Sequence, residues 1–253
     1  MARNGFNTSK LVDFYLFWKF LLNNPHHRAA QKKTAEELAK KPARTDIINF
    51  LLSRATGETN YLELGVGNPC NNYSYILATN KYSVDPGCDY KMNQADYKMT
   101  SDMFFDLLKA DKLLSRKIRF DVILIDGLHL AEQVDRDIIN SLGFIKDDGF
   151  IVLHDCNPPT EWHAREEYSC YMTPAGLHWN GTTWKTFLKW RFDPQVYSCC
   201  IDSDFGVGIL SKGTMIGQSI NKTNQFFEFA NLSQNRKEYL NLMSFDEFTK
   251  LLK

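Results

Sequence analysis

The middle of the chain alternates short, mainly apolar runs with longer segments of helical periodicity. Residues 120–126 and 149–155 are apolar enough to form strands buried on both faces, and a helical pattern over residues 131–145 separates them. Two further strand-like runs, residues 61–65 and 82–85, come earlier in the chain. Strands that alternate with helices form right-handed βαβ units. The sequence therefore predicts an α/β fold built on a parallel sheet.

The last two strands of this region are connected differently from the earlier ones. Its last two strand-like runs, residues 196–201 and 206–210, are separated by only four residues. A connection that short cannot make a parallel crossover, so we expect a hairpin that adds an antiparallel strand. A weaker strand candidate, residues 96–100, precedes a helix that we expect Ser101 to cap. A mostly parallel sheet that ends in an antiparallel strand limits the candidate folds.

Helical patterns flank the predicted sheet. Asn24 and Pro25 break a first helix, Thr34 is expected to open a second with a capping box, and residues 46–53 predict a third. The first helix carries apolar residues at helical spacing, which suggests a core or homodimer contact: Leu11, Phe14, Tyr15, Trp18 and Leu22.

These patterns divide the 253 residues into three parts. We expect an N-terminal helical extension of residues 1–55, a central domain of residues 56–215 and a helical tail of residues 216–253. Within the central domain, residues 158–192 show little regular pattern and are rich in Trp, Tyr, His and Arg. Long loops in compact domains are usually functional. We expect this segment to cover a substrate or to pack on the sheet through its own aromatic side chains.

Charge and cysteine usage narrow the classes of partner. Lys and Arg total 30 and Asp and Glu total 30, without the basic excess typical of duplex-binding proteins. The six cysteines form no CxxC pair, which favours free thiols in a reducing cytoplasm. The apolar stretch of residues 12–22 contains Asp13 and Lys19 and is too short for a membrane span. We therefore expect a cytoplasmic protein with a small-molecule partner, without nucleic acid or membrane.

The turn after the first predicted strand indicates a nucleotide cofactor. Gly65 and Gly67 allow the backbone to approach a ligand closely, and ligands of such sheets bind at the carboxyl ends of the strands. Glu63 precedes the turn, and Asp85 ends the next strand. A carboxylate at the position of Asp85 can accept hydrogen bonds from both ribose hydroxyls of an adenosine.

Two other nucleotide-binding motifs fit poorly. A dinucleotide fingerprint needs a glycine three residues after Gly67, where Cys70 stands. Pro69 also lacks the N–H that a pyrophosphate would bind. The P-loop pattern GxxxxGK[ST] does not occur. A nicotinamide-dependent oxidoreductase and a non-catalytic nucleotide-binding module on the same fold remain as alternatives.

The sequence resembles the class I S-adenosylmethionine-dependent methyltransferases. The resemblance extends over about residues 58–212. The motifs that carry it are residues 63–67, Asp85, residues 120–126 and the final hairpin. It implies a doubly wound, mostly parallel seven-stranded sheet with an antiparallel C-terminal hairpin strand, plus N-terminal helices. It also implies that S-adenosylmethionine is the cofactor.

The resemblance further implies where the parts of the cofactor bind. The methionine part would lie on Glu63 and on the backbone of Gly65 and Gly67, and the ribose on Asp85. The adenine would lie near Ser101 and Asp102. The remaining residue expected to contact the cofactor is Asp126, at the end of the fourth strand.

Two strand ends carry groups suited to chemistry at the centre of the site. Asp126 and His129 follow one strand in the order Asp-Gly-Leu-His, and His154 and Asp155 end the next strand. If the strands are neighbours, the two aspartates lie side by side. Two carboxylates with a histidine make a divalent-metal site, and the histidine favours Mn over Mg. We therefore expect Asp126, His154 and Asp155 to be ligands of Mg or Mn.

The Asp-Gly-x-His element is similar to that of the macrocin- and mycinamicin-type sugar O-methyltransferases. This resemblance implies that Asp126 and Asp155 bind a metal and that His129 is the general base, although residue 154 is His where those enzymes have an acidic residue. It implies O-methylation of a small hydroxylated acceptor such as a sugar. Each residue also has a structural alternative: a helix cap for Asp126, a structural histidine for His129 and a turn for Asp155.

Overall fold

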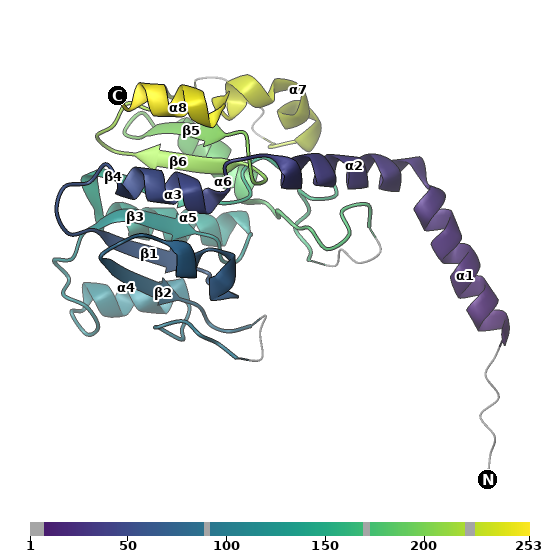
Figure 1. Ribbon diagram of the computed structural model, residues 1–253, viewed down its shortest axis with the longest axis horizontal. Helices are drawn as coiled ribbons and strands as arrows, with labels where there is room; N and C mark the ends of the chain where they lie inside the picture. The colour runs from purple at the N-terminus through teal and green to yellow at the C-terminus, as the bar shows by residue number, and fades with distance from the viewer. Residues whose placement is uncertain (1–7, 89–91, 169–172, 221–225) are drawn as a thin grey trace, which may run out of the picture.

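The structure, a computed structural model, describes residues 8–88, 92–168, 173–220 and 226–253 (Figure 1). A seven-stranded sheet has the strand order β2-β1-β3-β4-β6-β5-β7. The strands are β1 (Asn60–Leu64), β2 (Asn80–Val84), β3 (Phe120–Ile125), β4 (Ile145–Leu153), β5 (Tyr197–Ile201), β6 (Val207–Ser211) and β7 (Leu242–Met243).

Helices precede, alternate with and follow these strands. They are α1 (Thr8–Asn23), α2 (Pro25–Ala39), α3 (Arg44–Leu52), α4 (Ser101–Lys109), α5 (Ala131–Leu142), α6 (Thr183–Arg191), α7 (Phe229–Tyr239) and α8 (Phe245–Leu251). Two short 3₁₀ turns, η1 (Pro69–Asn71) and η2 (Tyr73–Tyr75), follow β1.

The predicted α/β architecture is confirmed. Strands β2, β1, β3 and β4 pair in parallel, and β6 runs antiparallel to both β4 and β5. All residues of β3 are buried because apolar side chains cover the sheet on both faces. Ile123 packs in the cluster with α4, α5 and α6, whereas Val122 packs in the cluster with α3 and α8. The hairpin expected from the short connection is β5–β6.

Two predictions at the edges of the sheet were wrong in detail. Residues 96–100 form no strand, and Tyr97 makes only an isolated bridge to Val84. The Asp96 carboxylate accepts hydrogen bonds from the N–H and hydroxyl of Ser83, while the backbone of Tyr97 makes hydrogen bonds with Ser83 and Asp85. At the other edge, the tail expected to be helical contains the two-residue strand β7, which pairs with β5.

Helix ends also differ from the expected caps. Asn24 caps α2 with its side chain and Pro25 occupies the first turn, as is usual for proline. Thr34 lies inside α2, where its hydroxyl donates to the carbonyl of Ala30, so it opens no helix. The cap of α4 is Thr100, whose hydroxyl accepts from the N–H of Met103.

Helices α1 and α2 form an arm that projects from the domain (Figure 1). The second half of α2 anchors the arm, with Ala30, Thr34 and Glu37 buried. The apolar residues of α1 were expected in a core or a contact, but Leu11, Phe14, Tyr15 and Trp18 are exposed in the single chain; the side chain of Leu22 lies outside the described part. Among the described residues, no helix has the length and apolar character needed to cross a membrane.

Candidate active site

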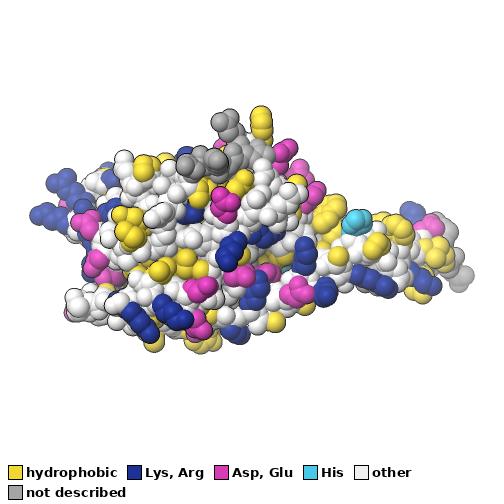
Figure 2. All heavy atoms as spheres, turned by 90° about the horizontal axis from the view of Figure 1, so that it is seen from above, with side chains coloured by type: hydrophobic (Ala, Val, Ile, Leu, Met, Phe, Trp, Pro, Cys, Tyr) yellow, Lys and Arg dark blue, Asp and Glu magenta, His cyan; other side chains and the backbone are white. Residues whose placement is uncertain are grey.

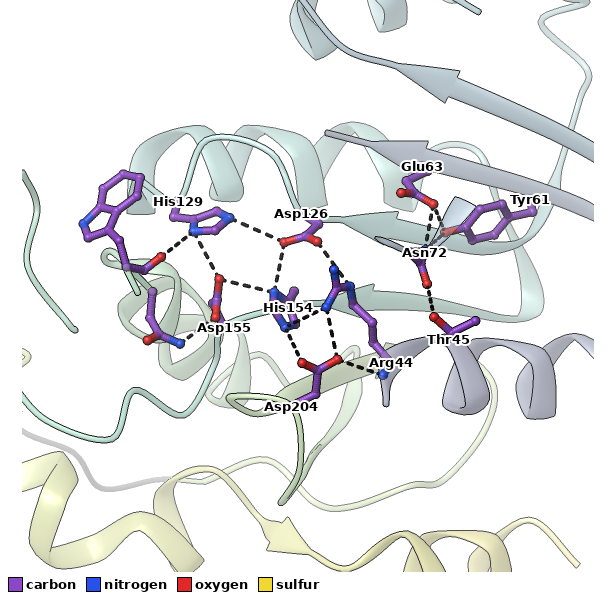
Figure 3. A network of polar contacts seen from close by, with 12 residues as sticks. Arg44, Thr45, Tyr61, Glu63, Asn72, Asp126, His129, His154, Asp155 and Asp204 are labelled. Carbon is purple, nitrogen blue, oxygen red and sulfur yellow. Dashed lines mark hydrogen bonds and ion pairs between the residues drawn. The ribbon is translucent and has the colours of Figure 1, made fainter. Parts of the chain in front are cut away.

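The carboxyl ends of β3 and β4 place four predicted residues together. Ile125 pairs with Leu153, so the residues that follow them, Asp126 and His154, leave the sheet side by side. Asp126 Oδ1 is 3.0 Å from His154 Nδ1, and Asp155 Oδ2 is 3.2 Å from the same nitrogen (Figure 3). These three atoms lie within 4.8 Å of one another. The predicted convergence of Asp126, His154 and Asp155 is therefore present.

Each of these three side chains is oriented by a partner on its second polar atom. The contacts are Arg44 Nε with Asp126 Oδ2 at 3.4 Å, Asp204 Oδ1 with His154 Nε2 at 3.3 Å, and Asn180 Nδ2 with Asp155 Oδ1 at 2.6 Å. Arg44 begins α3 and also pairs with Asp204 at 3.1 Å. Asp155 itself has φ 64, a left-handed conformation that Asp tolerates better than most residues. The cluster is held from several sides.

His129 lies against the same two aspartates. Its Nδ1 is 3.1 Å from Asp155 Oδ2 and 3.0 Å from the carbonyl oxygen of Trp179, and its Nε2 is 3.4 Å from Asp126 Oδ1. The Trp179 ring stacks on the imidazole with centroids 5.4 Å apart. Gly181 touches the backbone of His129 so closely that a Cβ there would lie 2.1 Å from the carbonyl oxygen. Residues 179–181 thus lie directly on His129.

The carboxylates control the protonation of both histidines. Burial opposes a charged imidazole, but Asp155 and Asp126 outweigh it and raise the pKa of His129 to about 9. The same balance raises the pKa of His154 well above its usual value. Burial would raise the pKa of Asp126, yet His154 and Arg44 lower it well below its usual range. Three carboxylates therefore face three cations at neutral pH. The carboxylates are those of Asp126, Asp155 and Asp204, and the cations are Arg44 and the two histidines.

The cluster fits a divalent metal. Neighbouring ligands of an octahedral ion with bonds of about 2.1 Å lie about 3 Å apart, and the separations here are 3.0 and 3.2 Å. Ligating histidines and carboxylates are normally fixed by a second polar contact, which here is a hydrogen bond from Asn180 and an ion pair with Arg44 or Asp204. A metal would take the place of the proton on His154 Nδ1.

Glu63 is more deeply buried than we would expect for a residue that faces a ligand. It is 1% exposed, and its Oε2 accepts from the Tyr61 hydroxyl at 2.6 Å and from Asn72 Nδ2 at 2.8 Å (Figure 3). Asn72 in turn accepts from Thr45 Oγ1 at 2.7 Å. Burial raises the pKa of Glu63 to about 7. The neighbours Arg44 and Thr45 thus connect α3 to the cluster of Asp126, His154 and Asp155 and to the Glu63 network.

Gly65 brings the first strand end to this cluster. It has φ +89, and a Cβ would lie 2.3 Å from Gly127 Cα and 2.4 Å from the carbonyl oxygen of Asp126. Only glycine allows the two loops to touch in this way. After Gly67 the chain enters η1, which Asn68 caps and which has Pro69 in its first turn.

Asp85 fits a ribose. Its Oδ2 accepts from the N–H of Gly67 at 2.9 Å and its Oδ1 from the N–H of Gly87 at 2.6 Å. Each carboxylate oxygen keeps a lone pair for a further donor, and the residue is partly exposed. A carboxylate at this position in such a sheet can accept hydrogen bonds from the hydroxyls of a ribose.

Ser101 and Asp102 are placed apart from the cluster of Asp126, His154 and Asp155, at the start of α4. Gln133 Nε2 donates to Ser101 Oγ at 3.1 Å, and Arg136 Nε contacts Asp102 Oδ2 at 3.3 Å. Both partners belong to α5. The structure therefore joins Asp126, His129, His154 and Asp155 in one cluster, and Gly67 with Asp85 in another contact.

A cavity of about 180 Å³ opens beside the cluster. It is lined by His154, Asp155, Leu177, His178, Trp179, Asn180 and Phe205. His178 stacks on Phe205 with centroids 5.6 Å apart. Asn180 Oδ1 is buried and has no hydrogen-bond partner among the described residues. The cavity thus has flat apolar walls beside the polar groups of His154 and Asp155.

Sequence reasoning missed four residues of this site. Arg44, Trp179, Asn180 and Asp204 come from the start of α3, the 158–192 segment and the β5–β6 turn. None belongs to a local motif, because each reaches the cluster only through the tertiary fold. The available signal was coarse: residues 158–192 were expected to cover a substrate or to pack on the sheet, and Trp179 and Asn180 lie within this segment.

Comparisons with known proteins place the chain in a family. A family model described as a methyltransferase domain matches residues 24–156, and no curated sequence gives a significant match. Solved structures similar to the chain include an O-methyltransferase from Bacillus cereus in complex with SAH, at 13% identity over 80% of this chain and 97% of that chain, with a TM-score of 0.42. TomG from Streptomyces achromogenes, in complex with SAM, has 11% identity over 84% and 99%, with a TM-score of 0.43.

The MycE methyltransferase of the mycinamycin pathway, in complex with Mg and SAH, has 14% identity over 81% of this chain and 59% of that chain, with a TM-score of 0.42. Likenesses this distant carry no argument about an acceptor or a metal. The family match is different, since it covers more than half of the chain and includes β1 to β4 with Asp126, His129 and Asp155. The chain belongs to the methyltransferase domain family.

Proposed function

We propose that the protein transfers a methyl group from S-adenosylmethionine to a hydroxyl oxygen of a small hydroxylated acceptor such as a sugar, assisted by a divalent metal. The observation that carries the proposal is the convergence of Asp126, His129, His154 and Asp155 at the strand ends of a methyltransferase-family chain. The sulfonium of the cofactor already activates the methyl group. The tasks left to the protein are alignment and removal of the hydroxyl proton.

The cofactor would lie across the carboxyl ends of β1 and β2. In this proposal Asp85 accepts from the ribose hydroxyls, and the turn of Gly65 and Gly67 lies along the methionine part. Glu63 would lie buried beside that turn, held by hydrogen bonds from Tyr61 and Asn72. The adenine would reach the start of α4, where Ser101 and Asp102 lie.

The metal would be held by Asp126 Oδ1, His154 Nδ1 and Asp155 Oδ2. Mg or Mn fits two carboxylates and an imidazole, the imidazole favouring Mn. When bound, the metal lowers the pKa of a hydroxyl that coordinates it. Arg44, Asp204 and Asn180 keep the three ligands in place.

His129 is the proposed general base. Its Nδ1 faces the carbonyl oxygen of Trp179 at 3.0 Å, so Nδ1 keeps a proton and Nε2 is the atom that accepts one. The carboxylates raise the pKa of His129 to about 9, which leaves it protonated at neutral pH unless another cation balances their charge. The base and the metal are therefore linked: His129 acts only when a cation occupies the cluster.

The cavity beside the cluster suggests the size of the acceptor. At about 180 Å³ it is smaller than the 300–1,000 Å³ typical of sites for drug-sized ligands. It has room for one ring. Trp179 and the His178–Phe205 pair offer flat faces for the apolar side of such a ring.

Binding of S-adenosylhomocysteine by calorimetry tests the cofactor assignment. We expect the wild type to bind and Asp85→Ala to bind at least ~10-fold more weakly, because the ribose loses its acceptor. Asp106→Ala removes an exposed carboxylate from the outer side of α4 and should leave the affinity unchanged. No binding by the wild type, or equal binding by Asp85→Ala, would contradict the assignment. Methyl transfer is then measured with labelled cofactor across a panel of sugars and other polyols.

A further inference from the structure

Helix α1 presents an apolar surface that its own domain does not cover. Eight large apolar side chains between Leu11 and Phe20 are 37% to 66% exposed: Leu11, Val12, Phe14, Tyr15, Leu16, Phe17, Trp18 and Phe20. With side chains of this kind burying up to about 150–250 Å² each, their exposed parts add up to roughly 800 Å². The largest apolar patch of a typical monomer is about 300–600 Å². Such a surface marks an interaction site.

The arrangement of these residues indicates a partner that encloses the helix. At 100° per residue, positions 11, 12, 14, 15, 16, 17, 18 and 20 point in all directions around the axis. The helix lies at the end of the arm, away from the sheet, and hydrophobic side chains also show along the arm in Figure 2. A helix that is apolar all round is normally buried.

A membrane suits this helix poorly. Its 16 residues span about 24 Å, less than the ~30 Å of a bilayer core. A helix that lies in a membrane surface has one strongly charged face and one apolar face, whereas α1 has apolar residues on every side. A protein partner is the better occupant.

We propose that the partner is a second copy of the chain, and that the two α1 helices pack antiparallel about Leu16. Between Leu11 and Asn23 the helix carries two charges of opposite sign, Asp13 and Lys19, each three residues from Leu16. In an antiparallel pair Asp13 faces Lys19 of the partner subunit, and the pair repeats on the other side of the two-fold axis. A parallel pair would bring like charges together. The face of Leu16 is only part of the roughly 800 Å² of exposed apolar surface on α1. Because a stable interface buries about 800 Å² per partner, the other sides of α1 would pack against other parts of the partner subunit.

The first test is the mass of the full chain in solution. Analytical ultracentrifugation at micromolar concentration should give twice the 29.3 kDa of one chain. Val12→Ser with Phe20→Ser, which changes the two apolar residues beside Leu16 on the same face, should give the single mass while circular dichroism and the unfolding midpoint stay unchanged, since α1 lies outside the domain core. Leu77→Ser, at a side chain 78% exposed elsewhere, is the matched control and should remain a dimer.

The second test is a charge exchange that checks the antiparallel arrangement. Asp13→Lys alone and Lys19→Asp alone should each weaken the dimer at least ~10-fold, because each puts like charges opposite one another. The double variant with both changes restores opposite charges and should recover the wild-type dissociation constant. A double variant no tighter than the singles overturns the antiparallel pairing.

A wild type that is monomeric at tens of micromolar overturns the proposal. Flotation with vesicles of phosphatidylcholine and phosphatidylserine distinguishes the other occupant: a monomer that floats with the vesicles shows that α1 binds lipid instead. Both tests need neither cofactor nor acceptor, so they are independent of the proposed methyl transfer.

Discussion

At the scale of single residues, the site depends on side chains that each make two contacts. Asp126, His154 and Asp155 turn one polar atom toward the cluster and give the other to Arg44, Asp204 or Asn180. Charge balance follows from this pairing, because three carboxylates meet three cations when no metal is bound. A bound metal would replace protons of the histidines, so the cluster would not simply gain the charge of the metal.

Asp155→Asn tests the metal assignment most directly. Asn tolerates the left-handed backbone at φ 64 nearly as well as Asp, so the fold should persist while one anionic ligand is lost. We expect Mn²⁺ affinity, followed by electron paramagnetic resonance, and methyl transfer each to fall at least ~100-fold. S-adenosylhomocysteine affinity should stay within about threefold.

Asp147→Asn is the control for that change, since Asp147 is a fully exposed carboxylate. It should bind Mn²⁺ and turn over like the wild type. Full activity of Asp155→Asn, or of the wild type in excess chelator, would remove the metal from the proposal.

Asn180→Ala tests a residue that positions another. Its Nδ2 holds Asp155 Oδ1 at 2.6 Å, so its loss frees the carboxylate to rotate. Second contacts of this kind are worth about 10–100-fold in metal affinity. We expect that loss in Mn²⁺ affinity, with turnover partly recovered at saturating Mn²⁺. An unchanged affinity would show that Asn180 serves only the cavity.

At the scale of elements, three strand ends assemble the site because their loops touch. The parallel strands β2, β1, β3 and β4 end at one edge, and the loop after β1 lies directly against the loop after β3 at Gly65 and Gly127. The first turn of α3 then spans both halves through Arg44 and Thr45. The site is therefore sensitive to backbone contacts as well as to its charged groups.

Gly65→Ala should show this contact, and Gly57→Ala is its matched control. Both glycines have positive φ, +89 and +80, but an added Cβ meets Gly127 Cα at 2.3 Å at residue 65 and nothing within 4 Å at residue 57. Gly57→Ala should cost about 1 kcal/mol for the left-handed backbone alone. Gly65→Ala should lower the unfolding free energy by at least about 3 kcal/mol in urea titrations, and weaken S-adenosylhomocysteine binding. Equal costs for the two variants would refute the loop contact.

At the scale of the whole molecule, local patterns predicted the sheet better than its surroundings. Residues 122–125 of β3 and 150–153 of β4 are apolar throughout and the β5–β6 connection is short, so the strand types and the antiparallel hairpin follow from the sequence. Strand β7 has two residues and exists because β5 offers an edge, which no local pattern reports. In the same way Asp126 and His129 form a visible motif, whereas Arg44 and Asp204 join them only after 160 residues of chain have folded.

His163 joins residues 158–192 to the arm, and we expect its titration to affect how the whole molecule responds to acid. His163 is fully buried, with Nε2 3.0 Å from the Thr34 hydroxyl of α2 and Nδ1 2.8 Å from the Thr160 hydroxyl. Burial, with the charge of His178 nearby, lowers its pKa to about 4 from 6.5. The folded state thus resists a proton that the unfolded state accepts.

The sign of the pH dependence follows from that difference. The contribution of His163 to stability is complete above about pH 6.5 and is lost as the pH falls toward 4, so lowering the pH from 7.5 to 4.5 should remove about 2 kcal/mol. His163→Gln cannot titrate and should lose less stability over this interval, although it starts from a lower value because a buried contact has changed. His26→Gln, at an exposed histidine in the first turn of α2, should keep the wild-type slope. Urea unfolding midpoints at the two pH values measure all three, and parallel slopes for wild type and His163→Gln would show that another group controls the response to acid.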